Sequence, residues 1–80
     1  MENIQLDYFI EIAREMSITK AAEHCHVTQQ NLSAYVKKLE SNYNVQLLER
    51  KPRFRLTPAG EILFASALEI RRIYTIWRRS

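Results

Sequence analysis

The apolar residues of this chain recur at helical spacing in four separate stretches. The first two cover residues 4–16 and 18–25, and their apolar positions follow steps of three and four, as on one face of an amphipathic helix. Ser17 and Thr28 precede the second and third stretches and are suited to cap a helix N-terminus. The third stretch, 29–42, carries an apolar stripe that runs on to Tyr43. Asn44 follows, and asparagine tolerates the left-handed conformation that ends helices.

The periodicity changes between residues 45 and 57. An apolar run leads to Arg50, residues 51–53 form a predicted turn around a proline, and residues 54–56 alternate as a strand does. Thr57-Pro58 then combines a capping residue with a proline at the first helical position, which predicts a last helix over 58–79. We therefore predict a mainly α winged helix-turn-helix, three helices plus a two-stranded wing, over 1–57, and a long linker helix over 58–80.

Length and composition agree with one small domain. Eighty residues bury only about 60% of the surface of the unfolded chain, so a partner subunit would help stability. A single cysteine excludes an internal disulfide, and neither a signal peptide nor a membrane span is visible. We therefore expect a cytoplasmic protein with no membrane partner. Residues 1–36 carry a net charge of −3 and residues 37–80 carry +6, so one face is expected to meet a polyanion.

The solvent side of the predicted third helix is polar and basic. Its start reads Thr28-Gln29-Gln30-Asn31-Leu32-Ser33, and Lys37 and Lys38 follow one to two turns later. In a helix-turn-helix this end of the second helix lies at the base edges of the major groove, where amide side chains match the N6/N7 edge of adenine. The helix N-terminus also offers free N–H groups to phosphate. Taken alone, an ordinary solvated helix face is the alternative.

Four basic residues lie at or beside the tip of the predicted hairpin: Arg50, Lys51, Arg53 and Arg55. Held together, they would repel one another unless an anion lay nearby, and a wing arginine can enter a narrow minor groove. A solvated run of charge is the alternative for the wing by itself. The helix and the wing together, at this separation in one fold, favour double-stranded DNA as the partner.

Residues 17–40, S-I-T-K-A-A-E-H-C-H-V-T-Q-Q-N-L-S-A-Y-V-K-K-L-E, resemble the helix-turn-helix of bacterial LysR-type transcriptional regulators. The segments L-L-E-R (47–50) and L-T-P-A-G (56–60) are similar to the family's wing entry and to the start of its linker helix. The resemblance covers over half of the chain at constant register. It implies sequence-specific DNA binding in transcription regulation, with the third helix (28–42) in the major groove and the basic wing (50–55) at the minor groove.

The resemblance also places the contact residues. It implies recognition-helix contacts at the start of the third helix, wing arginines near the backbone and minor groove, and a phosphate contact from the second helix. With the residues argued above, the expected DNA-binding set is Thr19, Thr28, Gln29, Gln30, Asn31, Ser33, Ala34, Lys37, Lys38, Arg50, Lys51 and Arg53. Cys25, Gln30, Ala34 and Tyr35 depart from the usual leucine, proline, arginine and glutamine, so the base preference of relatives does not transfer.

The last helix is too apolar for a lone surface helix. Two apolar stripes run along it, and the three-helix core can cover only one of them. In LysR-type proteins the linker helices pair and form the dimer, so we expect a homodimer that reads a two-fold operator, with recognition helices about 34–36 Å apart. The expected dimer interface is Leu63, Ala67, Ile70, Ile73, Tyr74 and Trp77. We expect the chain to be a fragment that lacks the family's effector-binding domain, through which alone a small-molecule effector would act.

Other kinds of site find little support. His24, Cys25 and His26 are adjacent, and neighbouring residues on a helix point apart, so we expect no metal and no cofactor. Cys25 belongs to an apolar stripe, which predicts burial and low reactivity. No catalytic constellation or glycine-rich phosphate loop is present, so an enzyme is not expected. The remaining alternative is a winged helix that contacts another protein through its last helix.

Overall fold

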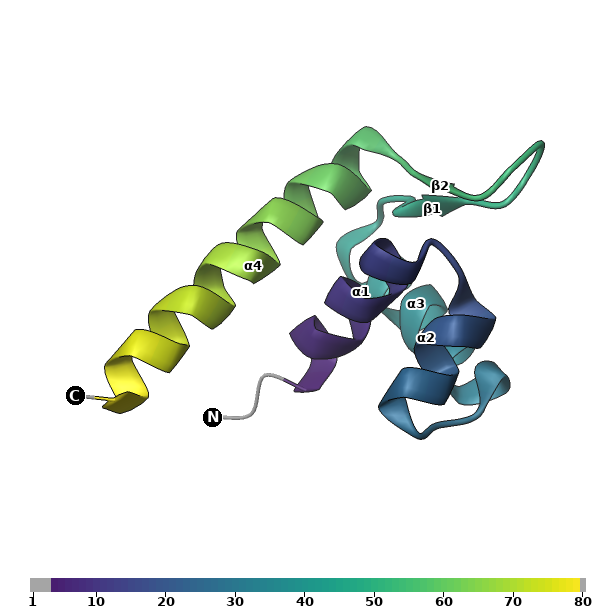
Figure 1. Ribbon diagram of the computed structural model, residues 1–80. Coiled ribbons are helices and arrows are strands. Elements are labelled where there is room, and N and C mark those ends of the chain that lie inside the picture. Colours follow the sequence, from purple (N-terminus) through teal and green to yellow (C-terminus); the bar gives the residue numbers. More distant parts are fainter. Residues whose placement is uncertain (1–3, 80) are drawn as a thin grey trace.

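The computed structural model describes residues 4–79, so the outer domain limits predicted at residues 1 and 80 lie outside the described residues. Figure 1 shows a compact helical body, a projecting hairpin and one long helix that extends away from them. The elements are α1 (Ile4–Glu15), α2 (Ile18–Cys25), α3 (Gln29–Tyr43), β1 (Leu48–Glu49), β2 (Arg55–Leu56) and α4 (Pro58–Arg79). The predicted fold class, a mainly α winged helix-turn-helix followed by a long helix, is confirmed.

Side-chain caps set the beginnings of the helices in the helix-turn-helix. The Ser17 hydroxyl accepts a hydrogen bond from the Lys20 amide at 3.1 Å, and the Thr28 hydroxyl accepts one from the Asn31 amide at 3.0 Å. His26 and Asn44 take the left-handed conformation at the ends of α2 and α3. The predicted caps and the left-handed Asn44 are therefore confirmed, and α3 ends one residue later than expected.

Met16 differs from the prediction. We assigned it to the apolar stripe of the first helix, but that helix ends at Glu15, and Met16 has a φ of 50° and is 43% exposed. The left-handed conformation turns the chain out of α1 so that Ser17 can cap α2 immediately afterwards. Met16 therefore serves the turn and contributes little to the core.

The core lies where α1, α2, α3 and the base of the hairpin meet. Its fully buried large side chains include Phe9 and Ile12 of α1 and Leu32 and Val36 of α3. Two buried alanines of α2 let this helix approach its neighbours closely. The rings of Tyr8 and Tyr35 meet edge to face, with centroids 5.5 Å apart. This packing orients α3, because one side of the helix is held in the core and the other remains exposed.

The two strands form an antiparallel pair in which Leu48 lies opposite Leu56 and Glu49 opposite Arg55. We call residues 48–56 the wing. Its base is joined to α4, since the Thr57 amide donates to the Leu47 carbonyl at 3.0 Å and the Thr57 hydroxyl donates to the Gln46 carbonyl. The same hydroxyl accepts from the Gly60 amide at 3.0 Å, which confirms Thr57 as the cap of α4.

One side of α4 packs against α1, and this corrects two of the predicted dimer contacts. Ala67 has no exposed surface, and Leu63 packs against the core within the same chain. A small residue at position 67 allows close approach of α1, and Arg71 then reaches Asp7 at 3.2 Å. Ala67 and Leu63 therefore belong to the intramolecular contact. None of the helices within residues 4–79 has the length and apolarity that a membrane crossing needs.

Candidate nucleic-acid interface

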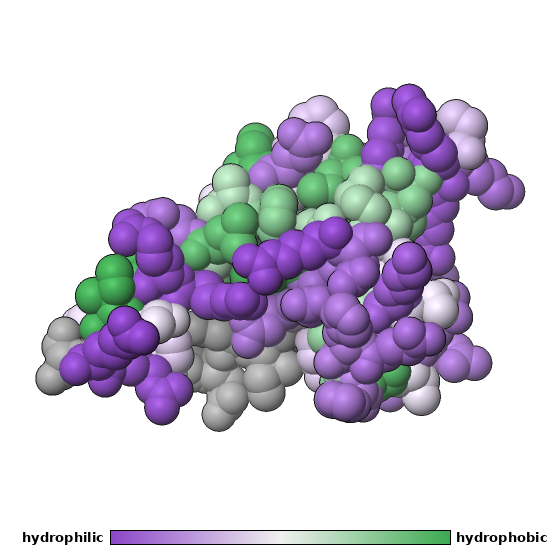
Figure 2. All heavy atoms as spheres, in the orientation of Figure 1, coloured by the Kyte–Doolittle hydropathy of each residue, from purple (hydrophilic) through white to green (hydrophobic). Residues whose placement is uncertain are grey.

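The face of α3 that points away from the core carries the predicted contact residues. Thr28, Gln29, Gln30, Asn31, Ala34, Lys37 and Lys38 are exposed, and Ser33 is half-buried. A shallow hollow of about 470 Å³ runs along Gln29, Gln30, Ser33, Ala34 and Lys37. Figure 2 shows mostly hydrophilic surface over the helix-turn-helix, in contrast to the apolar surface along α4. The face is open, polar and free of acidic side chains.

The orientation of α3 is set by the contrast between its buried side and its exposed side. Leu32 and Val36 are buried and hold the helix from within, while the exposed residues are offset from them by part of a turn. The first N–H groups of a helix have no acceptor within the helix, and since that of Asn31 is bonded to the Thr28 hydroxyl, those of Gln29 and Gln30 are available to an anion at this end. The geometry thus presents amide side chains and helical N–H groups together at the start of α3.

Of the four basic residues in the wing, three have no counter-charge, and the fourth, Arg55, is paired with an acid. Arg50, Lys51 and Arg53 are exposed, and within residues 4–79 no ion pair involves them. The Arg55 guanidinium lies 2.6 Å from the Glu49 carboxylate across the strand pair. The anion that the clustered bases were expected to need is thus supplied to Arg55 by Glu49 of the same chain. We call Arg50, Lys51 and Arg53 the wing cations.

The wing and α3 border one open hollow of about 670 Å³. Lys37 and Glu40 of α3 line it on one side, and Arg50 and Lys51 of the wing line it on the other. Cations thus face the same space from two elements that are separated in sequence. The single α3 acid at this boundary, Glu40, was missing from the predicted set, although its place beside basic residues could have drawn attention to it.

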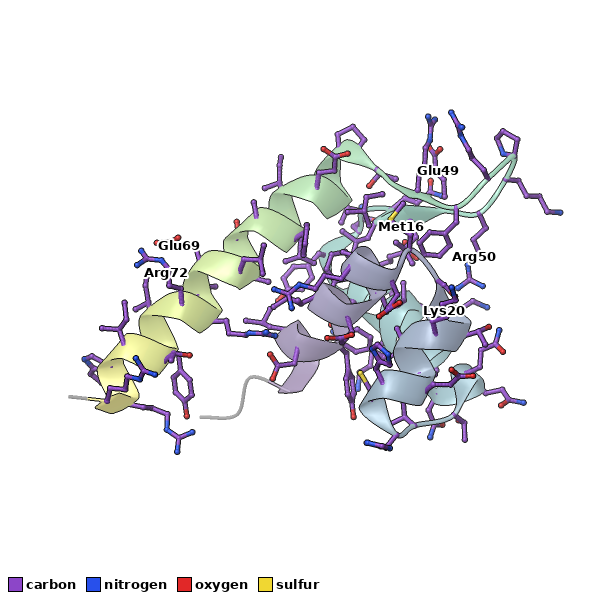
Figure 3. The ribbon with its side chains drawn as sticks, in the orientation of Figure 1. Met16, Lys20, Glu49, Arg50, Glu69 and Arg72 are labelled. Carbon is purple, nitrogen blue, oxygen red and sulfur yellow. The ribbon has the colours of Figure 1, made fainter. Side chains whose placement is uncertain are left out.

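The second helix adds hydroxyl and ammonium groups at its start. Thr19 is exposed, as expected of a phosphate contact, and the neighbouring Lys20 is exposed as well. Figure 3 shows Lys20 and Arg50 on the part of the molecule where the helix-turn-helix and the wing are drawn. Lys20 was not in the predicted set, although its position next to Thr19 in the first turn of the helix was the available signal.

One group of side chains that could hold a metal ion, Glu11, Glu15 and His24, lies between α1 and α2, and its members contact one another. The His24 Nδ1 atom lies 3.2 Å from a Glu11 carboxylate oxygen and 2.9 Å from a Glu15 oxygen, which links α2 to α1. Cys25 is half-buried, and burial, followed by the charges of Glu11 and Asp7, raises the pKa of its thiol. A raised pKa disfavours the reactive thiolate, so Cys25 has the properties of a packing residue.

Comparison with known proteins gives a consistent set of relatives. The family model "Bacterial regulatory helix-turn-helix protein, lysR family" matches residues 4–61. The transcriptional regulator AlsR of Bacillus subtilis is 48% identical over 63 residues, which is 78% of this chain and 21% of AlsR. The chain thus spans about a fifth of the length of that relative.

Solved structures agree over nearly the whole chain. The BenM DNA-binding domain in complex with catB site 1 DNA has a TM-score of 0.91 at 32% identity, with 99% of this chain and 86% of that chain covered. A full-length OxyR from Pseudomonas aeruginosa has a TM-score of 0.85 at 40% identity, with 99% of this chain and 27% of that chain covered. On the sequence of its helix-turn-helix, the geometry of its wing and these matches, the chain belongs to the LysR family of bacterial regulatory helix-turn-helix proteins.

Proposed function

We propose that this chain is the DNA-binding part of a transcriptional regulator and that it binds double-stranded DNA in a sequence-specific manner. In this proposal the start of α3 lies in the major groove and the wing cations lie at the minor groove. The observation that carries it is that Lys37 of α3 and the unpaired Arg50 and Lys51 of the wing face one shared hollow, next to an acid-free hollow along the start of α3. The likeness to the BenM domain, whose structure contains DNA, supports the same arrangement.

The proposal has three further parts. The helix-turn-helix and wing (1–57) form the DNA-binding unit, and the linker helix (58–80) forms a homodimer that reads a two-fold operator. The relatives are nearly four times as long as this chain, so an effector would act through a domain outside it. We also propose that the regulator works in the cytoplasm, where its DNA target lies.

The salt dependence of binding separates this function from protein contact through α4. Neutralised phosphates release counterions, so log K against log salt should fall with a slope of about −0.9 per phosphate contacted. Fluorescence anisotropy with a random duplex at several salt concentrations measures that slope. A steep slope supports DNA binding, whereas absence of binding at low salt favours the protein-contact alternative.

Arg53→Ala is expected to reduce the salt slope by about one unit, because one phosphate-neutralising cation is lost from the wing. The loss of affinity should be similar for all sequences. Arg72→Ala is the matched control, since Arg72 lies on α4 and is paired with Glu69 at 2.6 Å. An unchanged slope in Arg53→Ala, measured by anisotropy titrations, would remove this residue from the interface.

Gln29→Ala is expected to cost about 1–3 kcal/mol of DNA-binding free energy, but only at particular base pairs, because an amide that reads a base edge discriminates among bases. Competition binding against single-base variants of a selected site measures this pattern. Asn42→Ala, an exposed amide at the other end of α3, serves as the control. A uniform loss across all sequences would mean that Gln29 orients the helix and does not read a base.

A further inference from the structure

The sequence of α3 contains a single acidic residue, and it stands where an acid is least expected. Glu40 lies in the last turn of the helix, where the negative end of the helix dipole disfavours a carboxylate. It also borders the hollow between α3 and the wing cations, where an approaching phosphate would repel it. Its side chain is half-buried. Neither helix stability nor direct DNA contact accounts for this carboxylate.

The contacts of Glu40 lead to the wing. One carboxylate oxygen, Oε2, accepts hydrogen bonds from the Leu47 amide at 2.7 Å and from the Leu48 amide at 3.2 Å. The Glu40 backbone carbonyl accepts a third bond from the Val45 amide at 3.1 Å. Leu48 is the first residue of β1. A charged acceptor makes stronger hydrogen bonds than a neutral one, so this carboxylate binds the beginning of the wing firmly to α3.

Besides this contact, the Gln46 side-chain amide donates to the Leu48 carbonyl at 2.9 Å, and Thr57, the cap of α4, joins the base of the wing to that helix. Thr57 holds the backbone of Gln46 and Leu47, and Gly60 lies against the same segment. The strands of the wing are only two residues long, and a short two-stranded hairpin has little stability of its own. The direction of the wing relative to α3 therefore depends on what holds its first strand.

We propose that Glu40 is a positioning residue for DNA recognition. Its carboxylate holds the beginning of the wing at a set place relative to α3, so that the wing cations meet the minor groove when α3 occupies the major groove. Glu40 acts through the wing and does not touch DNA. This inference rests on the proposed function, because the position of the wing can change DNA affinity only if the wing contacts DNA.

The sign of the effect of Glu40→Ala distinguishes positioning from simple electrostatics. Removal of a negative charge beside DNA should strengthen binding if the charge alone matters. We expect the opposite, a fall in DNA affinity of about 3- to 30-fold, because the wing loses its attachment to α3. Glu40→Gln keeps an oxygen acceptor of the same reach without the charge, so it should bind DNA more tightly than Glu40→Ala. Glu61→Ala, which removes an exposed acid from α4, is the control for charge.

A double-mutant cycle with Arg53→Ala tests the route through the wing. We expect Arg53→Ala to weaken binding in the wild type and to have a much smaller effect in the Glu40→Ala background, since a displaced wing no longer places Arg53 correctly. In all of these variants the base preference at the position read by Gln29 should remain that of the wild type. Anisotropy titrations with one selected duplex provide all four affinities, and circular dichroism verifies that each variant is folded.

The outcomes decide the proposal. If Glu40→Ala binds as tightly as the wild type or more tightly, or if the two substitutions have additive effects, Glu40 does not position the wing. If Glu40→Ala fails to fold, Glu40→Asp replaces it in the same cycle, because the shortened carboxylate keeps its charge but no longer reaches the two amides. If the wild-type chain binds no duplex at low salt, the proposed function itself fails, whereas wild-type binding without coupling overturns the inference alone.

Discussion

Replacement of both Ile73 and Trp77 by glutamine is expected to leave a folded chain that binds a single half-site normally. Its affinity for a two-fold site should fall by about 10²- to 10⁴-fold. When two half-sites are read by one dimer, the second contact forms at a high effective concentration, and this gain disappears once the subunits separate. Glutamine is neutral, so the substitution leaves the salt-dependent part of DNA binding intact.

The exposed face of α4 is the reason for this choice. Ile73 is 52% exposed and Trp77 is 78% exposed, and Ile62, Ile70 and Ile76 are exposed on the same helix. With about 100° between successive residues, these positions form one face, to the side of the one that holds Ala67 against α1. Five large apolar side chains on one face of a helix indicate an interface. Relative to the predicted interface, this set leaves out Leu63, Ala67 and the half-buried Tyr74 and adds Ile62 and Ile76.

Sedimentation velocity and anisotropy measure the two parts of this prediction separately. Thr75→Gln is the control, because Thr75 is exposed on the same helix and lies away from the apolar face. The proposed dimer is wrong if the wild type sediments as a monomer at tens of micromolar. It is also wrong if the double variant becomes monomeric and still binds the two-fold site at wild-type affinity.

Gly60→Ala is expected to destabilise the fold by about 2–3 kcal/mol, although alanine favours helix formation by about 0.5–1 kcal/mol over glycine. A Cβ atom at position 60 would lie 2.2 Å from the Leu47 carbonyl oxygen. That oxygen cannot move freely, because it accepts a hydrogen bond from the Thr57 amide at 3.0 Å. Space for a methyl group is therefore lacking at the point where α4 crosses the base of the wing.

Thermal denaturation followed by circular dichroism measures this effect, which corresponds to a fall in Tm of roughly 10–20 °C for a domain of this size. Thr75→Ala adds no bulk at an exposed position of the same helix, away from the apolar face, and should leave the Tm unchanged or slightly raised. A Gly60→Ala variant as stable as the wild type would mean that the close approach of α4 to Leu47 is absent in solution.

Much of the fold could be predicted because local signals and tertiary packing agree. Ser17, Thr28 and Thr57 cap their helices as hydroxyl residues do, and Asn44 ends α3 in the left-handed conformation. The apolar stripe of α3 contains Leu32 and Val36, which are buried, and so identifies the opposite face as exposed. The exposed residues of the recognition helix follow directly from this periodicity.

The remaining features depend on contacts between distant segments, and a local pattern carries no signal for them. The pairing of Arg55 with Glu49 requires the strand register, and the role of Glu40 requires the path of the chain around residues 47 and 48. Which of the two apolar stripes of α4 is buried within the chain depends on where α1 lies. Because Ala67 is small, α1 packs against its side of the helix, and the larger residues remain exposed.

The most direct test of the central claim is selection of duplexes from a randomised pool by the wild-type chain at two salt concentrations, with anisotropy on the enriched sequences. We predict salt-sensitive binding and enrichment of a two-fold sequence whose half-sites are about one helical turn apart. Enrichment of no sequence, or binding that is unaffected by salt, would contradict sequence-specific DNA recognition by α3 and the wing.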